Sequence, residues 1–272
     1  MSDETPGAGP RAESSAADAP VLARREDGIG FITLNRPEKR NNLSSEVLGM
    51  LREALDAFAA DKSVRAIIIA AEGPVFSSGH NMKEFVGADT DAARAVFETS
   101  SKLMADLQRL PKPVIAQVAG LASAAGCQLV ASCDLVVAAS TARFQTPGVM
   151  IGLFCSTPMV PLSRAVPTKK AMEMLLTGEP ISAEEAERHG LVNRVVPPEK
   201  LEAETLALAR QIIQYSASTI ALGKEAFYKQ LPLDLDAAYE VGKEAITRNA
   251  MHPDGQEGMR AFLEKRPPKW QD

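Results

Sequence analysis

Apolar positions in the N-terminal part of the chain follow first a strand pattern and then a helix pattern. The stretch "GIGFITLNRP" is mostly apolar, is closed by Pro37 and predicts a strand. After Ser44, the expected N-cap, apolar residues recur at helical spacing in "SEVLGMLREALDAFAADK" and predict a helix. The next run, "VRAIIIAAEG", is too apolar on both faces for a sheet with a solvated side. It therefore predicts a buried strand.

This alternation continues through the middle of the chain. A helix is expected at 91–109, followed by a buried strand in "VIAQVAG" and a short helix after it. Strands are then expected in "DLVVAAS", "ARFQT" and "LVNRVVP", and two short helices ending at Gly178 and Gly190 precede the last of them. Strands that alternate with helices and lead into mostly helical sequence predict an α/β core at 21–200 and a C-terminal helical region at 201–272.

Length, charge and composition fit a globular protein with a sizeable core. A chain of 272 residues has room for one large domain, and 45% hydrophobic and 24% charged residues are ordinary values for such a domain. The net charge of −5 weighs against nucleic acid or an anionic membrane as the main partner. No apolar run approaches the length of a membrane span.

The N-terminal segment and the cysteines indicate the compartment. Residues 1–20 lack the basic start and apolar stretch of a secretory signal and carry too many acids for a mitochondrial presequence. They predict a disordered tail and a cytoplasmic location. The three cysteines are an odd number without a C-x-x-C spacing. They fit a reducing compartment and predict neither a disulfide framework nor a metal site.

Two loops rich in small residues are the first candidates for chemistry. In "FSSGHNMKEF", Ser78 and Gly79 let the backbone turn tightly and leave the N–H of His80 free to point outward. In "GLASAAGCQL", Ser123 is expected to cap a helix whose first turn offers unpaired N–H groups behind small side chains. Two such N–H groups that converge on one oxygen form an oxyanion hole. Taken singly, each loop is better explained as an ordinary tight turn than as a functional site.

Six separated blocks of the chain, in this order, resemble the enoyl-CoA hydratase/isomerase family, also called the crotonase superfamily. The blocks are "NRPEKRNNLS", "FSSGHNMKEF", "GLASAAGCQLVASCDLVVA", "ARFQTPGVMIGL", "LLTGEPISAEEAERHGLVNRVVP" and "EGMRAFLEKRPPKW", within residues 21–270. The resemblance implies ββα units wound into a right-handed spiral, with C-terminal helices that build a homotrimer or hexamer. It also implies an acyl-CoA substrate, with coenzyme A as part of that substrate and no permanently bound cofactor.

The resemblance assigns roles to particular residues. It implies that the thioester carbonyl oxygen accepts hydrogen bonds from the N–H groups of His80 and Ala125, the latter at a position where the family usually has glycine. Contacts to coenzyme A or the acyl group are implied for Glu38, Lys39, Arg40, Ser78, Gly79, Asn81, Met82, Gly126, Phe154, Cys155, Phe262 and Lys265. For Lys265, an ion pair on a solvated helix explains the residue equally well.

Both glutamates that family members use to add and remove water are replaced in this chain. The first position is Gln128, and the second, after the proline in "TPG", is Gly148. A glutamine amide orients a water or a substrate but transfers no proton near neutral pH, and glycine does neither. A positioned acid or base contributes about 10²–10⁴-fold in rate, so standard hydration is expected to be severely impaired. The loop "GLFCSTPM" also replaces a glycine-rich family loop. The residues that line the acyl end of the pocket therefore differ together from the family pattern.

Three other side chains near the inferred site are candidates for proton transfer or substrate contact. His80 could titrate near neutrality, although its position favours use of the N–H alone, with the ring turned outward. Cys155 could be a nucleophile, but a small buried cysteine without an identified base is more often a packing residue. Asn81 stands where the family commonly has aspartate and is expected to be a turn residue.

Three functions remain open on the sequence. The first is an acyl-CoA enzyme that uses the oxyanion hole for chemistry other than standard hydration, such as decarboxylation, isomerisation or thioester hydrolysis. The second is a non-catalytic acyl-CoA binding or scaffold protein. The third is a weak enoyl-CoA hydratase of fatty acid metabolism. A likeness of fold cannot choose among them, since function depends on the site.

Overall fold

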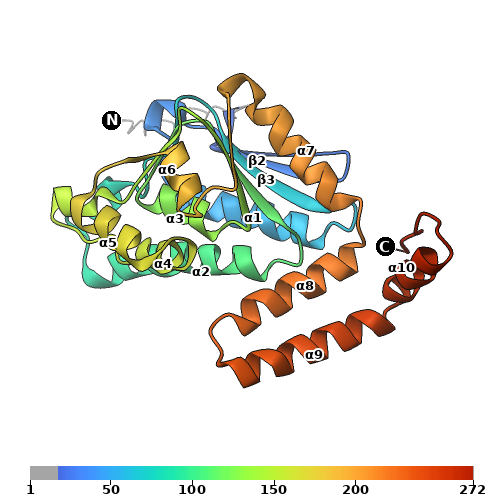
Figure 1. Cartoon of the computed structure of the whole chain (residues 1–272). Coiled ribbons are helices and arrows are strands. Elements are labelled where there is room, and N and C mark those ends of the chain that lie inside the picture. The colour runs from blue at the N-terminus through green and yellow to red at the C-terminus, as the bar shows by residue number, and fades with distance from the viewer. Residues whose placement is uncertain (1–17, 272) are drawn as a thin grey trace, which may run out of the picture.

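The computed structural model of the protein describes residues 18–271 and contains two β-sheets with helices packed around them (Figure 1). The larger sheet has the strand order β1-β2-β3-β5-β7-β10, and the smaller sheet has the order β4-β6-β8-β9. The strands are β1 (Val21–Glu26), β2 (Ile29–Leu34), β3 (Ala66–Ala71), β4 (Val75–Ser77), β5 (Val114–Val118), β6 (Leu121–Ser123), β7 (Leu135–Ala139), β8 (Arg143–Gln145), β9 (Ile181–Ser182) and β10 (Arg194–Val196).

Helix α1 forms as its sequence predicts. The Ser44 hydroxyl accepts a hydrogen bond from the N–H of Val47 at 3.3 Å, and the apolar face that includes Leu48 and Leu51 is buried. The α-helices are α1 (Ser45–Ala60), α2 (Thr90–Arg109), α3 (Ala125–Ser132), α4 (Met159–Ala165), α5 (Thr168–Thr177), α6 (Ala183–Arg188), α7 (Leu201–Ile213), α8 (Ala217–Gln230), α9 (Leu235–Met251) and α10 (Pro253–Leu263). Short 3₁₀ helices are η2 (Pro37–Lys39), η3 (Met82–Glu84), η4 (Pro147–Ile151) and η5 (Pro198–Lys200).

The chain passes repeatedly from the larger sheet to the smaller sheet and then into a helix. Strands β3 and β4 with α2 form one such unit, and β5 and β6 with α3 form the next. Strands of successive units pair in parallel in both sheets, β3 with β5 in the larger and β4 with β6 in the smaller. This arrangement is the predicted series of ββα units, and the α/β fold class is confirmed.

The central strands of the larger sheet, β3, β5 and β7, are largely apolar because both of their faces are buried. Ile67 and Ile69 of β3 belong to the main core, which they share with apolar residues of α1, α2 and α3. Ile68, which lies between them, packs with Ile115 of β5 in a second cluster that contains Leu208 of α7. Side chains alternate across a strand, so each face of the sheet receives its own helical cover. The buried strands expected from the sequence are confirmed.

Four strands have no counterpart among the predicted elements. Strand β1 pairs antiparallel with β2, in a register that places Val21 opposite Leu34. Strands β4, β6 and β9 contain only two or three residues each. So short a segment shows no alternation of apolar and polar positions, and its residues read as loop.

The N-terminal segment is described only in part. Of the predicted tail at 1–20, residues 1–17 lie outside the described residues. Ala19 and Pro20 are hydrogen-bonded to the residue that follows β2. Asn35 donates to the carbonyl oxygens of Pro20 at 2.8 Å and of Ala19 at 3.1 Å. Over residues 18–271, no helix combines the length and the apolar character needed to cross a membrane.

The C-terminal arm, defined as residues 217–271 and comprising α8, α9, α10 and the segment after them, extends beyond the sheets (Figure 1). A buried ion pair fixes its base, because the Lys224 ammonium of α8 donates to the Asp134 carboxylate at 2.6 Å. Lys224 also donates to two backbone carbonyl groups of the core, and the Tyr228 hydroxyl donates to Asp134 at 2.8 Å. Both charges therefore have several partners.

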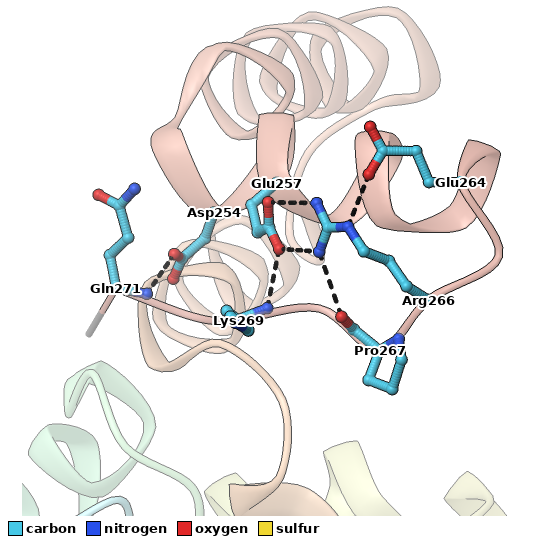
Figure 2. Close-up of polar contacts among 7 residues, drawn as sticks. All are labelled: Asp254, Glu257, Glu264, Arg266, Pro267, Lys269 and Gln271. Atoms are coloured by element: carbon cyan, nitrogen blue, oxygen red, sulfur yellow. Dashed lines mark hydrogen bonds and ion pairs between the residues drawn. The ribbon is translucent and has the colours of Figure 1, made fainter.

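The end of the arm folds back onto α10 in a set of polar contacts, the C-terminal clasp (Figure 2). The Arg266 guanidinium donates two hydrogen bonds to the Glu257 carboxylate, at 2.6 and 3.0 Å. The N–H of Lys269 donates to Glu257 as well, and the N–H of Gln271 donates to the buried Asp254. These contacts fix the last described residues of the chain against the helix.

The surface of the arm carries many exposed apolar side chains. They are Phe227, Leu231, Leu233, Leu235, Tyr239, Ile246, Met251, Met259, Phe262 and Leu263. An extended apolar surface of this kind is typical of protein–protein contacts. The homotrimer or hexamer implied by the sequence resemblance stays a prediction, and this surface is where we expect the contacts to form.

Candidate functional site

The two candidate loops meet at one edge of the smaller sheet. Residues 78–80 follow β4 and residues 124–126 follow β6, and these two strands pair in parallel, so their carboxyl ends lie together. A Cβ placed on Gly79 would lie 3.1 Å from the backbone nitrogen of Ala125. Gly79 also has a φ of +91°, in the left-handed region that favours glycine. Glycine is therefore needed at this position for both space and backbone conformation.

A second close contact joins the start of α3 to the end of β4. A Cβ placed on Gly126 would lie 2.5 Å from the carbonyl oxygen of Ser77 and 2.7 Å from its Cβ, so a larger residue would separate the two segments. Because Ser77 comes just before the loop that carries His80, this contact fixes the first turn of α3 beside that loop.

Each loop presents a backbone N–H that has no hydrogen-bond partner among residues 18–271. Ala125 is the first residue of α3, so its N–H has no acceptor within the helix. The N–H of His80 is also unpaired, although the adjacent carbonyl of Gly79 accepts a hydrogen bond from Leu43 at 2.8 Å. Unpaired N–H groups on two adjoining loops have the chemistry of oxyanion-hole donors.

The N-cap of α3 differs from the prediction. Ser123 is the last residue of β6, and its hydroxyl accepts a hydrogen bond from the side chain of Gln145 at 3.0 Å. The N-cap is Ala124, which has a φ of +50° and no side chain that can cap the helix. The expected Ser123 cap is wrong because β6 runs through Ser123, which pairs with Gln145 of β8. The first turn of α3 therefore lacks a side-chain acceptor.

Gln128, at the first family glutamate position, is buried and has an unpartnered amide oxygen. The residue is 2% exposed, and its Oε1 accepts no hydrogen bond within the described chain. Gln128 lies about one turn after Ala125, and side chains on a helix lean toward its N-terminus. The amide therefore lies beside the turn that carries the unpaired N–H. It can orient a ligand there but cannot transfer a proton.

Gly148, at the second family glutamate position, has no room for a side chain. A Cβ placed there would lie 2.7 Å from the carbonyl oxygen of Leu153 and 2.9 Å from the Sγ of Cys155. The N–H of Gly148 donates a hydrogen bond to the same Sγ at 3.3 Å. The loop after η4 thus fills the space that a glutamate would need. A glutamate at this position would therefore require the surrounding loop to move.

The cysteines near the site are held as neutral thiols. Burial raises the pKa of the Cys127 thiol to about 12. Burial also raises the pKa of Cys155, against a weaker opposing effect of the hydrogen bond from Gly148. Neither thiol is ionised near neutral pH, and a protonated thiol is a poor nucleophile. This state agrees with the interpretation of Cys155 as a packing residue.

The ring of His80 is turned inward, not outward as expected. It makes edge contacts with the rings of Phe85 and Phe97, at centroid distances of 5.9 and 5.4 Å. Burial lowers the pKa of His80 to about 4, although the charge of Glu84 acts in the opposite direction. The expectation that this ring titrates near neutrality is therefore wrong, because the apolar surroundings disfavour the charged form. At neutral pH the ring is uncharged.

Asn81 and Glu84 stabilise the loop that follows His80. Asn81 is the N-cap of η3 and accepts a hydrogen bond from the N–H of Lys83, as expected of a turn residue. The Asn81 amide donates to Glu84 at 3.2 Å, and Ser45 donates to the same carboxylate through both its N–H and its hydroxyl. The carboxylate that lies near His80 is thus engaged in holding this loop to α1.

The residues predicted to contact coenzyme A fall into two groups. Lys39 and Arg40 lie beside the site loops, because the N–H of Ser78 donates to the carbonyl oxygen of Arg40 at 3.0 Å. They are exposed, as are Glu38 and Met82, and all four positions lie on segments next to the site loops. Their role as ligand contacts stays a prediction.

Phe262 and Lys265 form the second group and lie apart from these loops. Phe262 belongs to α10, which packs against α8 and α9 and is separated from α3 in the single chain (Figure 1). Its side chain is 82% exposed. Phe154 differs from both, since it neighbours Cys155 in the loop next to Gly148 and is half-exposed.

Unpaired polar atoms gather in this region. Five buried side-chain atoms lack a hydrogen-bond partner within the described chain, and three of them are the Nε2 of His80, the Oε1 of Gln128 and the Oγ1 of Thr146. Thr146 follows Gln145, whose carbonyl oxygen accepts a hydrogen bond from the N–H of Ala124 at 3.0 Å. Buried polar groups almost always have partners, so this gathering indicates a place that a ligand completes. Sequence reasoning missed Thr146 because no motif singles it out.

A surface pocket of about 670 Å³ lies along the first part of α2 and is lined by residues that include Thr90, Arg94 and Phe97. Its volume is within the range of small-molecule sites, about 300–1,000 Å³. Phe97 also contacts the His80 ring and stacks on Phe85, at a centroid distance of 4.9 Å. Phe97 therefore lies between this pocket and the loop that carries His80.

The fold and the paired loops define a protein of the crotonase type, and comparison with known proteins identifies the family. The chain belongs to the enoyl-CoA hydratase/isomerase family, whose model matches residues 24–272. A mouse relative, enoyl-CoA hydratase domain-containing protein 3, is 51% identical over 267 residues, which cover 98% of this chain and 89% of the relative. The resemblance found in the sequence blocks is confirmed.

Solved structures agree with this assignment. The crystal structure of the human enoyl-CoA hydratase domain-containing protein 3 is similar to this chain with a TM-score of 0.91 and 52% identity, covering 93% of this chain and all of the other. A Mycobacterium smegmatis enoyl-CoA hydratase has the same TM-score, the same coverage of this chain and 45% identity. This chain is thus similar to both the domain-containing protein 3 type and to enoyl-CoA hydratases.

The relatives correct the expected location. The mouse and human relatives are named as mitochondrial proteins, so the cytoplasmic location expected for this chain is wrong. That expectation depended on the acidic residues of an N-terminal segment, most of which lies outside the described residues. Targeting signals are read by receptors, and the charge of one segment did not indicate the compartment.

Proposed function

We propose that the chain binds an acyl-CoA thioester, whose carbonyl oxygen accepts hydrogen bonds from the N–H groups of His80 and Ala125. The observation that carries this proposal is the presence of these two unpaired N–H groups on adjoining loops, beside the unpartnered amide of Gln128. Membership in a family of acyl-CoA proteins supports the ligand class. Two backbone donors at such a site stabilise the negative charge that develops on a thioester oxygen.

The reaction we infer is chemistry other than standard hydration. Neither family glutamate is present, and the space at Gly148 is filled by Leu153 and Cys155. Isomerisation needs a proton carrier, and thioester hydrolysis needs an activated nucleophile. The His80 ring is a weak base near neutral pH because its pKa is lowered to about 4, and the protonated thiol of Cys155 is a poor nucleophile. Both reactions are less well supported for this reason.

Decarboxylation of a malonyl-type thioester is the reaction that the site supports best. The bond between the α-carbon and the carboxylate breaks, its electron pair forms the enolate of the thioester, and carbon dioxide leaves. No protein base takes part in that step. The two N–H groups stabilise the enolate oxygen. The α-carbon then takes a proton from water, and the hydroxide that remains combines with the released carbon dioxide as bicarbonate. Coenzyme A enters and leaves as part of the substrate, and no permanently bound cofactor takes part.

A second candidate is a non-catalytic acyl-CoA binding protein. It is favoured by the same feature that weakens hydration, since His80, Gln128 and Cys155 all lie close to the inferred acyl group without a titrating state near neutral pH. Weak hydratase activity in fatty acid metabolism is the third candidate. It would require a water held by Gln128 to act without a general base.

A panel of coenzyme A esters tests these candidates. We expect calorimetry to detect binding of butyryl-, crotonyl- and malonyl-CoA, and mass spectrometry to detect acetyl-CoA from the malonyl ester alone. Binding without any product would establish the non-catalytic candidate. Hydration of crotonyl-CoA at the rate of glutamate-bearing family members would contradict our reading of Gln128 and Gly148. Absence of binding to every ester would overturn the proposed function.

Two glycine variants test the N–H pair directly. Gly79→Ala places a methyl group 3.1 Å from the Ala125 nitrogen, whereas Gly87→Ala adds the same methyl at a similar positive φ with nothing within 4 Å. Both variants carry the backbone strain, but only the first obstructs the donor. We expect Gly79→Ala to weaken acyl-CoA binding at least tenfold relative to Gly87→Ala.

A further inference from the structure

We propose that Gln128 and Thr146 form a polar subsite that selects acyl groups bearing an oxygen substituent over plain hydrocarbon acyl groups. The substituent is a hydroxyl or a carboxylate on the acyl chain. This inference rests on the proposed acyl-CoA ligand, because the subsite adjoins the N–H pair that would hold the thioester. It concerns what lies at the other end of the acyl group, where the family glutamates are absent.

The first observation is the condition of Gln128. It is 2% exposed, and its Oε1 has no partner within residues 18–271. Its place on α3, about one turn after Ala125, directs the amide toward the N-terminal end of that helix. A polar atom that is buried and unpaired lowers the stability of the protein, because it has lost its hydrogen bonds to water without replacement. A bound group that pairs with the amide would remove this penalty.

The second observation comes from a different strand of the smaller sheet. Thr146 follows β8 and is fully buried, and its Oγ1 is also without a partner in the described chain. The preceding residue, Gln145, accepts a hydrogen bond from the N–H of Ala124 at its backbone carbonyl and pairs with Ser123 across the sheet. Thr146 therefore approaches the start of α3 from β8, while Gln128 approaches it from within the helix.

The two groups together fit an oxygen substituent. A primary amide offers an acceptor oxygen and two N–H donors, and rotation of its terminal bond presents either one. The threonine hydroxyl both donates and accepts. A hydroxyl on the acyl group would donate to Oε1 and accept from Thr146, and a carboxylate would accept from both side chains. A hydrocarbon chain would leave both polar groups unpaired, which is the basis of the selectivity.

Matched esters measure this selectivity on the full-length protein. Butyryl-CoA supplies the hydrocarbon reference, 3-hydroxybutyryl-CoA the hydroxyl and malonyl-CoA the carboxylate, with product checked by mass spectrometry. We expect at least one oxygen-bearing ester to bind about tenfold or more tightly than butyryl-CoA, because a hydrogen bond to a buried group is worth about that factor. Equal affinity for all three esters would refute the subsite while leaving the proposed function intact.

Substitutions then assign the selectivity to the two side chains. Gln128→Met and Thr146→Val remove the polar atoms with little change in volume, and each is expected to abolish most of the preference between esters. Thr205→Val is the matched control, since Thr205 is equally buried but lies in α7 on the other face of the larger sheet. It should keep the preference. A preference that survives in both site variants would overturn the assignment. If the unmodified protein binds none of the esters, the proposed function is overturned instead.

Discussion

Buried polar groups are arranged differently at the base of the C-terminal arm and at the start of α3. At the base of the arm, Asp134 accepts hydrogen bonds from Lys224, from Tyr228 and from a backbone N–H of the core. At the start of α3, Gln128 and Thr146 each bury a polar atom with no partner in the described chain. Folding alone saturates the first region and leaves the second incomplete. The difference separates groups that hold the fold from groups that await a ligand.

The two regions also differ in charge. The base of the arm contains a buried ammonium and a buried carboxylate, each stabilised by the other. The site region contains a neutral imidazole, neutral thiols and an amide. Any chemistry at α3 therefore depends on backbone dipoles and hydrogen bonds, since no side chain at either family glutamate position carries a charge.

The largest expected effect comes from breaking the saturated region. Lys224→Met leaves the Asp134 carboxylate buried without its cation. Removing one partner of a buried ion pair costs about 3–5 kcal/mol, so the free energy of unfolding measured by urea denaturation should fall by that amount. Lys243→Met removes the exposed pair with Glu240 and should lower it by at most about 1 kcal/mol. Similar losses in the two variants would mean that the buried pair is no stronger than a surface pair.

Gln128→Met removes a polar group that has no partner, at the start of α3. Because Oε1 has no partner to lose, replacing the amide with an apolar side chain of similar size should leave the ligand-free protein unchanged or slightly more stable. A loss of more than about 1 kcal/mol on urea denaturation would show that the amide is already paired in the free protein. Lys224→Met and Gln128→Met thus test the two halves of the comparison.

The next effect concerns the filled space at the second glutamate position. Gly148→Ala places a methyl group 2.7 Å from the carbonyl oxygen of Leu153, and overpacking of this kind costs about 1–3 kcal/mol. Gly49→Ala, in the middle of α1 with nothing within 4 Å, should instead stabilise the protein by roughly 0.5–1 kcal/mol. Thermal unfolding of both variants measures the contrast. If Gly148→Ala is as stable as Gly49→Ala, the loop is able to move aside and a glutamate could be restored.

Much of the fold could be predicted because its main elements are long and periodic. Helix α1 begins where Ser44 predicts it, and strand β3 is buried on both faces as its continuous apolar run indicates. Strands β4 and β6 could not be predicted, since three residues carry no periodicity and the pairing of these strands is non-local. The same lack of signal explains why Ser123, the predicted N-cap of α3, is instead the last residue of a strand.

For the site, the sequence identifies residues but not their surroundings. The sequence alone shows that Gln128 and Gly148 replace the two family glutamates. That Cys155 occupies the space beside Gly148, and that the His80 ring turns toward Phe85, depends on contacts between segments distant in sequence. The pKa of His80 follows from those contacts, so it could not be deduced from the residue type.

The acid sensitivity of His80 provides a smaller effect with a defined sign. Its pKa is lowered from 6.5 to about 4, so between these values the unfolded chain binds the proton and the folded chain does not. Stability should therefore fall as the pH falls through this window, by about 1 kcal/mol between pH 7 and pH 5.5. His80→Gln should lose less over the same interval. An NMR titration of the ring with its midpoint near 6.5 would contradict the burial seen here.

The smallest effect on stability is expected at the C-terminal clasp, where all the partners are present and the ion pair between Arg266 and Glu257 is only partly buried. Hydrogen bonds from Arg266 lower the pKa of Glu257 to about 2, so the clasp should be fully formed above pH 4.5 and be lost as the pH falls toward 2. Arg266→Gln should leave the urea midpoint nearly unchanged and speed hydrogen exchange at the Lys269 amide. Arg260→Gln removes the same charge from α10 without these bonds and should leave that exchange slow.

Hydrogen exchange at the clasp and at the start of α3 compares paired and unpaired backbone amides in one experiment. An acyl-CoA ester should slow exchange at the His80 and Ala125 amides, because the thioester oxygen supplies the acceptor that the folded chain lacks. It should leave the Lys269 amide unchanged, because Glu257 already accepts its hydrogen bond. Equal slowing at both places would indicate a general stabilisation of the fold. Slowing confined to the α3 region would show that the unpaired groups are the ones that the ligand completes.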